Sequence, residues 1–307
     1  MAIALGLFIG SLAQDLVGAI ELILWPLLGL LLYTTFVQVP LHRLRDAFLD
    51  RRFLAAAVVG NFLVVPLSVW VLLLLVPDVP AIQLGVLLVL LVPCTDWFIT
   101  FSHLGKGATR SAIAFSPLSL ILQMLLLPLY LWLFTGDAFT ASFVRLDMAL
   151  VFGGLVGLPL FAAYLTQRRV VRSNGYIVQR LSWLPVPLLA AVVFIIAATK
   201  VNLLFEFLHV FWLLLVVYVG YLVVAALAAR VLSGLFKLPI SQGRVLAFSM
   251  GTRNSFVVLP LALALPESYE LAVVAIVFQS LVELLGMAVY LWWIPNKLFP
   301  SVEIEAK

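Results

Sequence analysis

The sequence has few charged residues and almost no cysteine. Only 10% of its 307 residues are charged, 65% are hydrophobic, and Cys94 is the only cysteine. Soluble domains carry about 25% charged residues, so this composition excludes a soluble globular protein and indicates an integral membrane protein. A single cysteine also excludes an intramolecular disulfide framework.

Enzyme signatures are missing as well. The chain contains no Gly-rich loop ending in Lys-Ser or Lys-Thr, which would cradle phosphates, and no pair of histidines at metal-ligand spacing. We therefore expect neither an enzyme nor an ATP-driven pump, and no cofactor. The net charge of +4 is better explained by membrane topology than by binding of nucleic acid.

Apolar runs of about 20 residues follow one another along the whole chain. They predict an all-α membrane protein with one transmembrane domain over residues 1–307 and membrane lipid as its surroundings. The start of the chain lacks the basic segment and cleavage site of a signal peptide, so it is assigned to the first span. The ten expected spans are roughly 2–18, 20–39, 53–76, 82–103, 110–134, 146–166, 183–200, 208–230, 245–265 and 271–294.

Basic residues fall on alternate connections between these spans. Only Arg145 and Lys200 lie on one side, and Arg253 lies within a span. By the positive-inside rule, this asymmetry predicts a multi-pass protein of the cell membrane with both termini in the cytoplasm. The basic residues assigned to the cytoplasmic side are Arg43, Arg45, Arg51, Arg52, Lys106, Arg110, Arg168, Arg169, Arg172, Arg180, Arg230, Lys237, Arg244, Lys297 and Lys307.

Ten spans divide into two halves of five, about 1–135 and about 145–295. An odd number of spans per half makes the second half run in the opposite sense, which is the inverted-repeat layout of many secondary transporters. The fourth span is interrupted at Pro93, and the ninth is interrupted around Arg253. Paired interruptions in corresponding spans point to a substrate site, so we expect the two broken helices to cross at the membrane midplane.

The interruptions carry the side chains that we expect to form the site. Charged residues within spans are costly in lipid and tend to line pathways or pair with each other. Asp96 and Arg253 are expected at similar depth, where they would meet directly or through substrate. The candidate substrate-binding residues are Cys94, Thr95, Asp96, Arg253, Asn254 and Asn61, and the candidates for proton coupling or charge pairing are Glu283 and Asp96.

Each of these residues also has a purely structural interpretation. A buried thiol such as Cys94 can serve as a small apolar filler, although a soft thiolate also suits a soft centre such as trivalent arsenic. Arg253 binds an anion, gates the pathway, or only pairs with a carboxylate. Glu283 is either a proton carrier or the partner of Arg253. Asn61 and Asn254 either line the site or link helices.

The sequence resembles the bile acid:sodium symporter superfamily, and within it the arsenical-resistance permeases that export arsenite. The resemblance covers most of the chain in the number and order of spans. It is carried by Gly60-Asn61-Phe62, by Pro93-Cys94 running to Leu104-Gly105-Lys106-Gly107, and by Gly251-Thr252-Arg253-Asn254-Ser255. Cys94, Gln123, Tyr130 and Leu281-Val282-Glu283 favour the arsenical branch.

The sequence departs from the sodium-coupled members at the positions where their two ions are held. Most of the hydroxyl, amide and carboxylate side chains that the resemblance implies there are missing, and Arg253 adds a fixed positive charge. We therefore expect sodium-independent transport. The residues at the matching positions are Phe98, Ile99, Ala112, Ser116, Ser249 and Arg253. A glutamate that arsenical permeases carry after the ninth-span asparagine is also replaced, in the segment Ser255-Phe256-Val257.

These observations predict a secondary transporter that works by alternating access on a small-molecule or anionic substrate. The favoured interpretation is a sodium-independent arsenite or metalloid efflux permease, with proton antiport through a carboxylate such as Glu283. The alternative is an organic-anion carrier in which Arg253 replaces a sodium ion. The oligomeric state is left open.

Overall fold

The computed structural model describes residues 5–6, 14–143, 153–170, 181, 183–199 and 208–301. Every regular element in these ranges is helical, which confirms the all-α prediction. The elements are α2 (Gln14–Gln38), η1 (Leu41–Leu49), α3 (Arg51–Val59), η2 (Gly60–Val64), α4 (Val65–Leu73), α5 (Pro80–Leu91), α6 (Trp97–Leu104), α7 (Thr109–Phe143), η3 (Gly153–Gly157), α9 (Leu158–Val170), α11 (Pro185–Thr199), α13 (Leu208–Leu235), α14 (Ile240–Gly251), α15 (Ser255–Leu263), η4 (Glu267–Tyr269), α16 (Glu270–Trp293) and η5 (Ile294–Leu298).

Several of these helices are long and apolar enough to cross a membrane. In the described part of the chain, four stretches meet that condition: Arg51–Leu73, Thr109–Gly136, Val210–Leu235 and Glu267–Leu298. Shorter apolar helices accompany them at Ile23–Gln38, Pro80–Leu91 and Pro185–Thr199. Helices satisfy their own backbone hydrogen bonds, which lipid cannot do, so this architecture is that of a multi-pass membrane protein.

The boundary expected between the first two spans is wrong. Sequence analysis placed it between residues 18 and 20, but α2 is one continuous helix from Gln14 to Gln38. Asp15 and Glu21 lie within this helix, because acidic residues are only modestly unfavourable in a helix and do not interrupt its hydrogen bonds. Most of the expected first span, apart from residues 5–6 and 14–18, lies outside the described residues.

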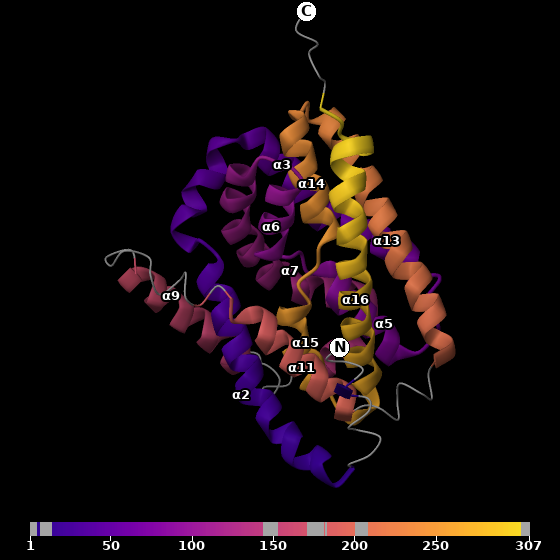
Figure 1. Ribbon diagram of the computed structural model, residues 1–307. Coiled ribbons are helices and arrows are strands. Elements are labelled where there is room, and N and C mark those ends of the chain that lie inside the picture. The colour runs from indigo at the N-terminus through magenta and orange to yellow at the C-terminus, as the bar shows by residue number, and fades with distance from the viewer. Residues whose placement is uncertain are drawn as a thin grey trace, which may run out of the picture.

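The helices pack in two groups. α2 packs mainly against α9 and α11, and the side chain of Gln167 on α9 donates hydrogen bonds to the carbonyl oxygens of Phe36 and Val37 near the end of α2. In the other group, α5 packs mainly against α16, and α13 packs against both α14 and α16. Figure 1 shows α2, α9 and α11 on one side of the bundle and the second group on the other.

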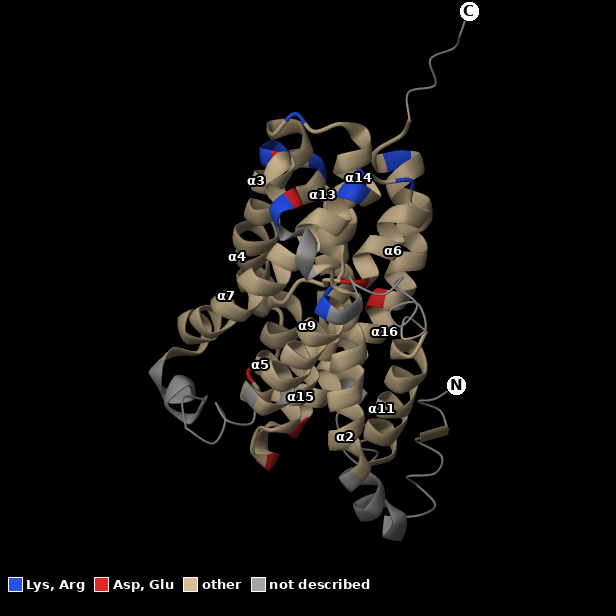
Figure 2. Cartoon of the chain, turned by 90° about the vertical axis from the view of Figure 1, so that its left-hand side faces the viewer, with Lys and Arg blue, Asp and Glu red and all other residues tan. Residues whose placement is uncertain are grey.

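Basic residues gather at one end of the bundle. Figure 2 shows Lys and Arg concentrated where α3 and α14 begin, whereas Asp and Glu are spread along the bundle, including beside α16 and around the opposite ends of α5 and α15. We call the first of these the basic end. Five of the basic residues used for the topology prediction lie outside the described residues, namely Arg145, Arg172, Arg180, Lys200 and Lys307.

Arg244 forms hydrogen bonds that link three segments of the chain at the basic end. It is only 4% exposed, and its guanidinium donates hydrogen bonds to the carbonyl oxygen of Phe299 at 2.8 Å and to that of Lys106 at 3.0 Å. These carbonyls follow the last turns of η5 and α6, where backbone oxygens lack partners within the helix. Arg244 therefore links α14 to the ends of two other helices.

Candidate functional site

Two helices of the second group are interrupted. α5 and α6, of 12 and 8 residues, are separated by residues 92–96, and α14 and α15, of 12 and 9 residues, are separated by residues 252–254. Pro93 explains the first interruption, because it has no N–H and forces the preceding residue out of helical geometry. Val92 accordingly has an extended backbone, with φ −107° and ψ 105°.

The two interruptions pair with each other. The backbone N–H of Cys94 donates to the carbonyl oxygen of Thr252 at 3.2 Å, and that of Asn254 donates to the carbonyl oxygen of Val92 at 2.8 Å. The segments thereby form an isolated antiparallel β-bridge. Unpaired backbone groups are costly in a membrane interior, and each break supplies the partners that the other lacks.

Polar side chains reinforce this crossing. Asn254 caps α15 by accepting a hydrogen bond from the N–H of Val257 at 3.4 Å, and its amide donates to the hydroxyl of Thr95, also at 3.4 Å. The hydroxyl of Ser116 on α7 donates to the carbonyl oxygen of Thr95. Thr95 and Asn254 thus hold the two segments together, and both are buried.

The guanidinium of Arg253 lies among oxygen atoms. The side chain is 2% exposed, and its terminal nitrogens donate hydrogen bonds to Asn61 Oδ1 at 3.0 Å and to the carbonyl oxygens of Ser249 at 2.8 Å, Met250 at 2.8 Å and Leu90 at 3.3 Å. Asn61 sits on the π-helical turn η2, and its amide nitrogen donates to the hydroxyl of Ser249 at 3.1 Å. Four oxygen atoms from three helical segments therefore accept hydrogen bonds from one cation.

The expected direct pairing of Arg253 with Asp96 is not formed. The guanidinium turns back towards α14, where its terminal nitrogens donate to the carbonyl oxygens of Ser249 and Met250, while its Nε is buried without a partner. Glu283 approaches Arg253 instead, but through the backbone: its Oε2 accepts a hydrogen bond from the N–H of Arg253 at 2.9 Å. Gln279, one turn earlier on α16, donates to the same oxygen at 2.7 Å.

A small cavity adjoins the crossing. Its volume is about 80 Å³, and it brings together a thiol, a carboxylate and two hydroxyls, from Cys94, Glu283, Ser255 and Ser280, with Arg253 also at its wall. The remaining lining residues are apolar or aromatic: Trp97, Phe101, Leu189, Phe256, Leu284 and Met287. Leu189 belongs to α11, so the cavity lies between the two groups of helices.

The cavity contains some of the predicted site residues and not others. Cys94, Arg253 and Glu283 line it, whereas Asn61, Thr95, Asp96 and Asn254 lie in the shell of hydrogen bonds behind it. Asp96 is 7% exposed; its Oδ1 accepts a hydrogen bond from the Cys94 thiol at 3.4 Å, and its Oδ2 is buried without a partner. In the described residues, no three His, Cys, Asp or Glu side chains are placed to hold a metal ion.

Two residues at the site were missed by sequence reasoning. Gln279 orients Glu283, and its position four residues earlier on one helix face was a usable signal. Tyr221 on α13 places its ring 5.6 Å from the Arg253 guanidinium and donates its hydroxyl to the carbonyl oxygen of Met250 at 2.6 Å. Nothing in the local sequence distinguishes Tyr221 from the other aromatic residues in the spans.

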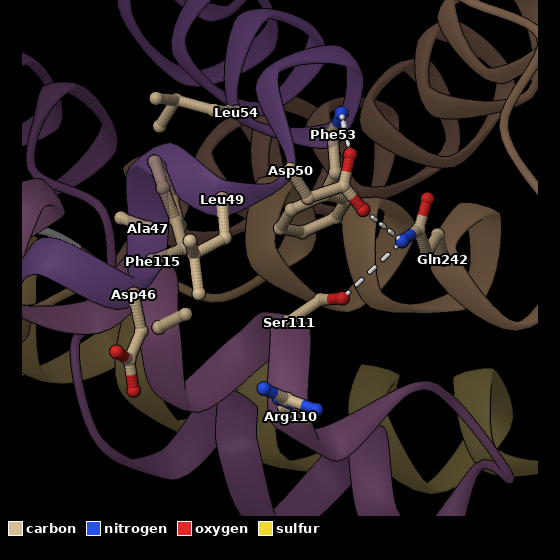
Figure 3. A pocket seen from close by; sticks show the side chains of 11 residues that line it. Asp46, Ala47, Leu49, Asp50, Phe53, Leu54, Arg110, Ser111, Phe115 and Gln242 are labelled. Atoms are coloured by element: carbon tan, nitrogen blue, oxygen red, sulfur yellow. Dashed lines mark hydrogen bonds between the residues drawn. The ribbon is translucent and has the colours of Figure 1, made fainter. Parts of the chain in front are cut away.

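A second cavity, of about 270 Å³, lies at the basic end between η1, α3, α7 and α14. Figure 3 shows Asp50 at its wall, accepting hydrogen bonds from the N–H of Phe53 and from the amide of Gln242, which also reaches Ser111. These contacts join the first turns of three helices. They lie at the basic end and are separate from the cavity beside Cys94.

Comparison with known families identifies the class of protein. The model of the Sodium Bile acid symporter family matches residues 25–207, more than half of the chain. The chain therefore belongs to the Sodium Bile acid symporter family, whose members are membrane transporters and not enzymes. No curated protein matches the chain significantly.

Proposed function

We propose that this protein is a sodium-independent secondary carrier that exports arsenite or a related trivalent metalloid by alternating access. The observation that carries sodium independence is the set of oxygen atoms around the Arg253 guanidinium. The observation that favours a metalloid is the Cys94 thiol at the wall of a small cavity. Neither observation depends on the other.

The surroundings of Arg253 support the proposed sodium independence. Hard cations are held by several oxygen ligands, and carbonyl and amide oxygens are typical of such sites. Here the same types of oxygen are occupied by a covalently attached cation. Phe98, Ile99 and Ala112 stand where the sodium-coupled pattern has oxygen-bearing side chains, and their side chains offer no ligand.

The cavity suits a small, uncharged and thiophilic solute. A volume of about 80 Å³ holds on the order of five water molecules. Arsenite in neutral water is the uncharged trihydroxide, whose hydroxyl groups match Ser255, Ser280 and Glu283. Trivalent arsenic is soft and prefers a sulfur ligand, which Cys94 supplies. One sulfur ligand binds weakly enough for a carrier that must release its load.

The organic-anion carrier is the second candidate. It is favoured by the position of Arg253 at the cavity wall, since a guanidinium fits a carboxylate in two-point contact. Two observations disfavour it. The terminal nitrogens of Arg253 already donate to four acceptors. Glu283, which accepts a hydrogen bond from the Arg253 backbone, would also repel an anion. A large anion would also require the cavity to open further.

The proposal also includes the membrane topology and the residue that couples transport to protons. We infer ten spans in two inverted halves, with α5–α6 and α14–α15 as equivalent broken helices, the basic end in the cytoplasm, and a single transmembrane domain. The antiparallel pairing of the two breaks and the similar lengths of their half-helices support this. Glu283 is the proposed proton carrier, because it faces the cavity and hydrogen-bonds the Arg253 backbone.

Arsenite resistance tests the substrate. Expression in an arsenite-sensitive host is expected to raise tolerance, and Cys94→Ser should abolish this gain because oxygen is a poor ligand for soft trivalent arsenic. Growth at increasing arsenite concentration is the measurement, with membrane levels of both proteins compared as the control. A variant that protects as well as the parent chain would favour the organic-anion carrier.

Proteoliposomes test the sodium prediction. Arsenite uptake into inside-out vesicles is expected to proceed at the same rate in sodium and in choline buffers, because Arg253 occupies the oxygen-lined position. An imposed pH gradient should change the rate if Glu283 couples transport to protons. A strict requirement for sodium would refute the assignment of Arg253 as the resident cation.

A further inference from the structure

We propose that Asp96 accepts the proton of the Cys94 thiol when that thiol binds a soft electrophile. The inference rests on the proposed function, because it assigns a proton-transfer partner to the proposed metalloid ligand. Asp96 contacts the reacting thiol directly and acts as its proton acceptor, although it is not among the residues that line the cavity.

The geometry places the two groups in contact. The Cys94 thiol donates to Asp96 Oδ1 at 3.4 Å, a normal length when sulfur is the donor. The thiol also lines the cavity, so it touches both the carboxylate and the space proposed for the solute. The Cys94 backbone is held by its hydrogen bond to Thr252, which keeps the thiol in place beside the break.

Asp96 does not cap α6 in the way that its position directly before this helix suggests. It directly precedes α6, and an aspartate there normally accepts a hydrogen bond from the first turn of its own helix. The Asp96 carboxyl interacts with the N–H of Trp97 but forms no capping hydrogen bond further into α6. It also contacts the thiol through Oδ1, and Oδ2 has no partner that meets hydrogen-bond geometry. Buried polar atoms are rarely left without a partner, and an oxygen that accepts a proton during transport would explain this exception.

The neighbouring charges explain why the thiol needs a local proton acceptor. Asp96 lies beside Cys94, Glu283 of α16 lines the same cavity, and the Arg253 guanidinium is directed into its own set of acceptors. A free thiolate next to two carboxylates is electrostatically unfavourable. Sulfur can therefore attack most easily if its proton moves to Asp96 as the new bond forms.

The proposed step is balanced. A sulfur–arsenic bond forms, the S–H bond breaks, and the proton passes to Asp96 and then to one hydroxyl of the arsenic trihydroxide. That hydroxyl leaves as water, and arsenic remains trivalent, so no oxidant or reductant is required. Release is the reverse: water adds to arsenic, the sulfur–arsenic bond breaks, and the thiol recovers its proton through Asp96.

Alkylation of Cys94 at different pH values tests the proton transfer without arsenic. The full-length protein is treated with N-ethylmaleimide, and the rate is followed by intact mass. For a thiol that reacts only as free thiolate, the rate rises about tenfold per pH unit below its pKa. We expect a clearly shallower rise in the parent protein, because Asp96 accepts the proton. Asp96→Asn should restore the full tenfold dependence and react at least about tenfold more slowly at slightly acidic pH.

Two variants control this experiment. Asp96→Glu keeps a carboxylate and should retain the shallow profile, whereas Asp78→Asn makes the same chemical change at an exposed residue and should behave like the parent. Superimposable profiles for the parent and Asp96→Asn would overturn the proposal. A full tenfold dependence in the parent protein would do so too, even if the Asn variant failed to fold.

A second arm separates this inference from the proposed substrate. Arsenite is added before N-ethylmaleimide, and protection of Cys94 is measured. Protection in the parent that is slower to develop in Asp96→Asn supports both the metalloid ligand and the proton transfer. Absence of protection in the parent overturns the metalloid step and the proposed function, while the alkylation profiles still decide whether Asp96 accepts the thiol proton.

Discussion

At the residue scale, Arg253 shows how a buried charge can be made part of the structure. Its terminal nitrogens donate to one amide oxygen and three carbonyl oxygens, and the ring of Tyr221 lies beside it. A buried polar group left without its hydrogen-bond partner typically costs about 1–3 kcal/mol. In the described part of the chain, Arg253 thereby links α14, α5 and η2 beside the two helix interruptions.

Arg253→Ala is expected to lower the free energy of unfolding by at least about 1–3 kcal/mol, because its neutral oxygen partners lose their donors. The emptied position should also accept a small cation. We therefore expect sodium to raise the Tm of the variant and to leave the Tm of the parent unchanged, measured in detergent against choline at equal ionic strength. Identical responses of the two proteins to sodium would contradict the role of Arg253 as a resident cation.

At the element scale, the broken helices depend on close packing with their neighbours. Gly85 on α5 faces Ala272 on α16, and a Cβ at residue 85 would lie 2.7 Å from the Ala272 carbonyl oxygen. Small residues allow membrane helices to approach closely, since apolar side chains gain no hydrophobic advantage over lipid. This contact holds the first half-helix against α16, which also carries Glu283.

Gly85→Ala is expected to destabilise the protein by about 1–3 kcal/mol, because the added methyl group forces the backbones of α5 and α16 apart. Gly29→Ala on α2 is the matched control: a Cβ there meets no atom within 4 Å, and alanine is the better helix former by up to about 1 kcal/mol. Thermal unfolding of the two variants in detergent is compared. Equal or reversed effects would show that the α5–α16 contact is not tight.

At the scale of the whole molecule, the cavity lies where the two groups of helices meet. Leu189 comes from α11, which packs with α2, and the other lining residues come from the group that contains the broken helices. A site between two bodies can be exposed to either side of the membrane when one body moves against the other. This arrangement is more compatible with alternating access than with transport through a continuous pore.

Leu189→Trp is expected to fill the cavity and to reduce transport at least about tenfold, while the Tm stays close to that of the parent because the added ring enters existing space. Val186→Trp on the same helix is the control, since Val186 is 55% exposed. Vesicle uptake and thermal unfolding are measured for both. Full transport by Leu189→Trp would place the solute pathway elsewhere.

Sequence reasoning located both interruptions. Pro93 indicated the first one, because proline removes a backbone donor and disfavours helical geometry in the residue before it. Proline alone does not decide this, since Pro117 and Pro128 lie inside α7. It failed at the start of α2, where the helix continues through Gly18 and the expected boundary. Depth also left open whether Arg253 meets Asp96 directly or through substrate, because depth does not determine the direction in which a long side chain extends; the direct contact is not formed.

The sequence by itself determined that this is an all-helical membrane protein with two interrupted helices and with charges placed inside them, because composition, apolar run length and proline act locally. Only the tertiary structure decided which groups meet. The breaks pair by their backbones, the Arg253 guanidinium turns to carbonyl oxygens, and the Cys94 thiol lies between Asp96 and the cavity. Such contacts join residues far apart in the chain, and their geometry depends on how the helices cross.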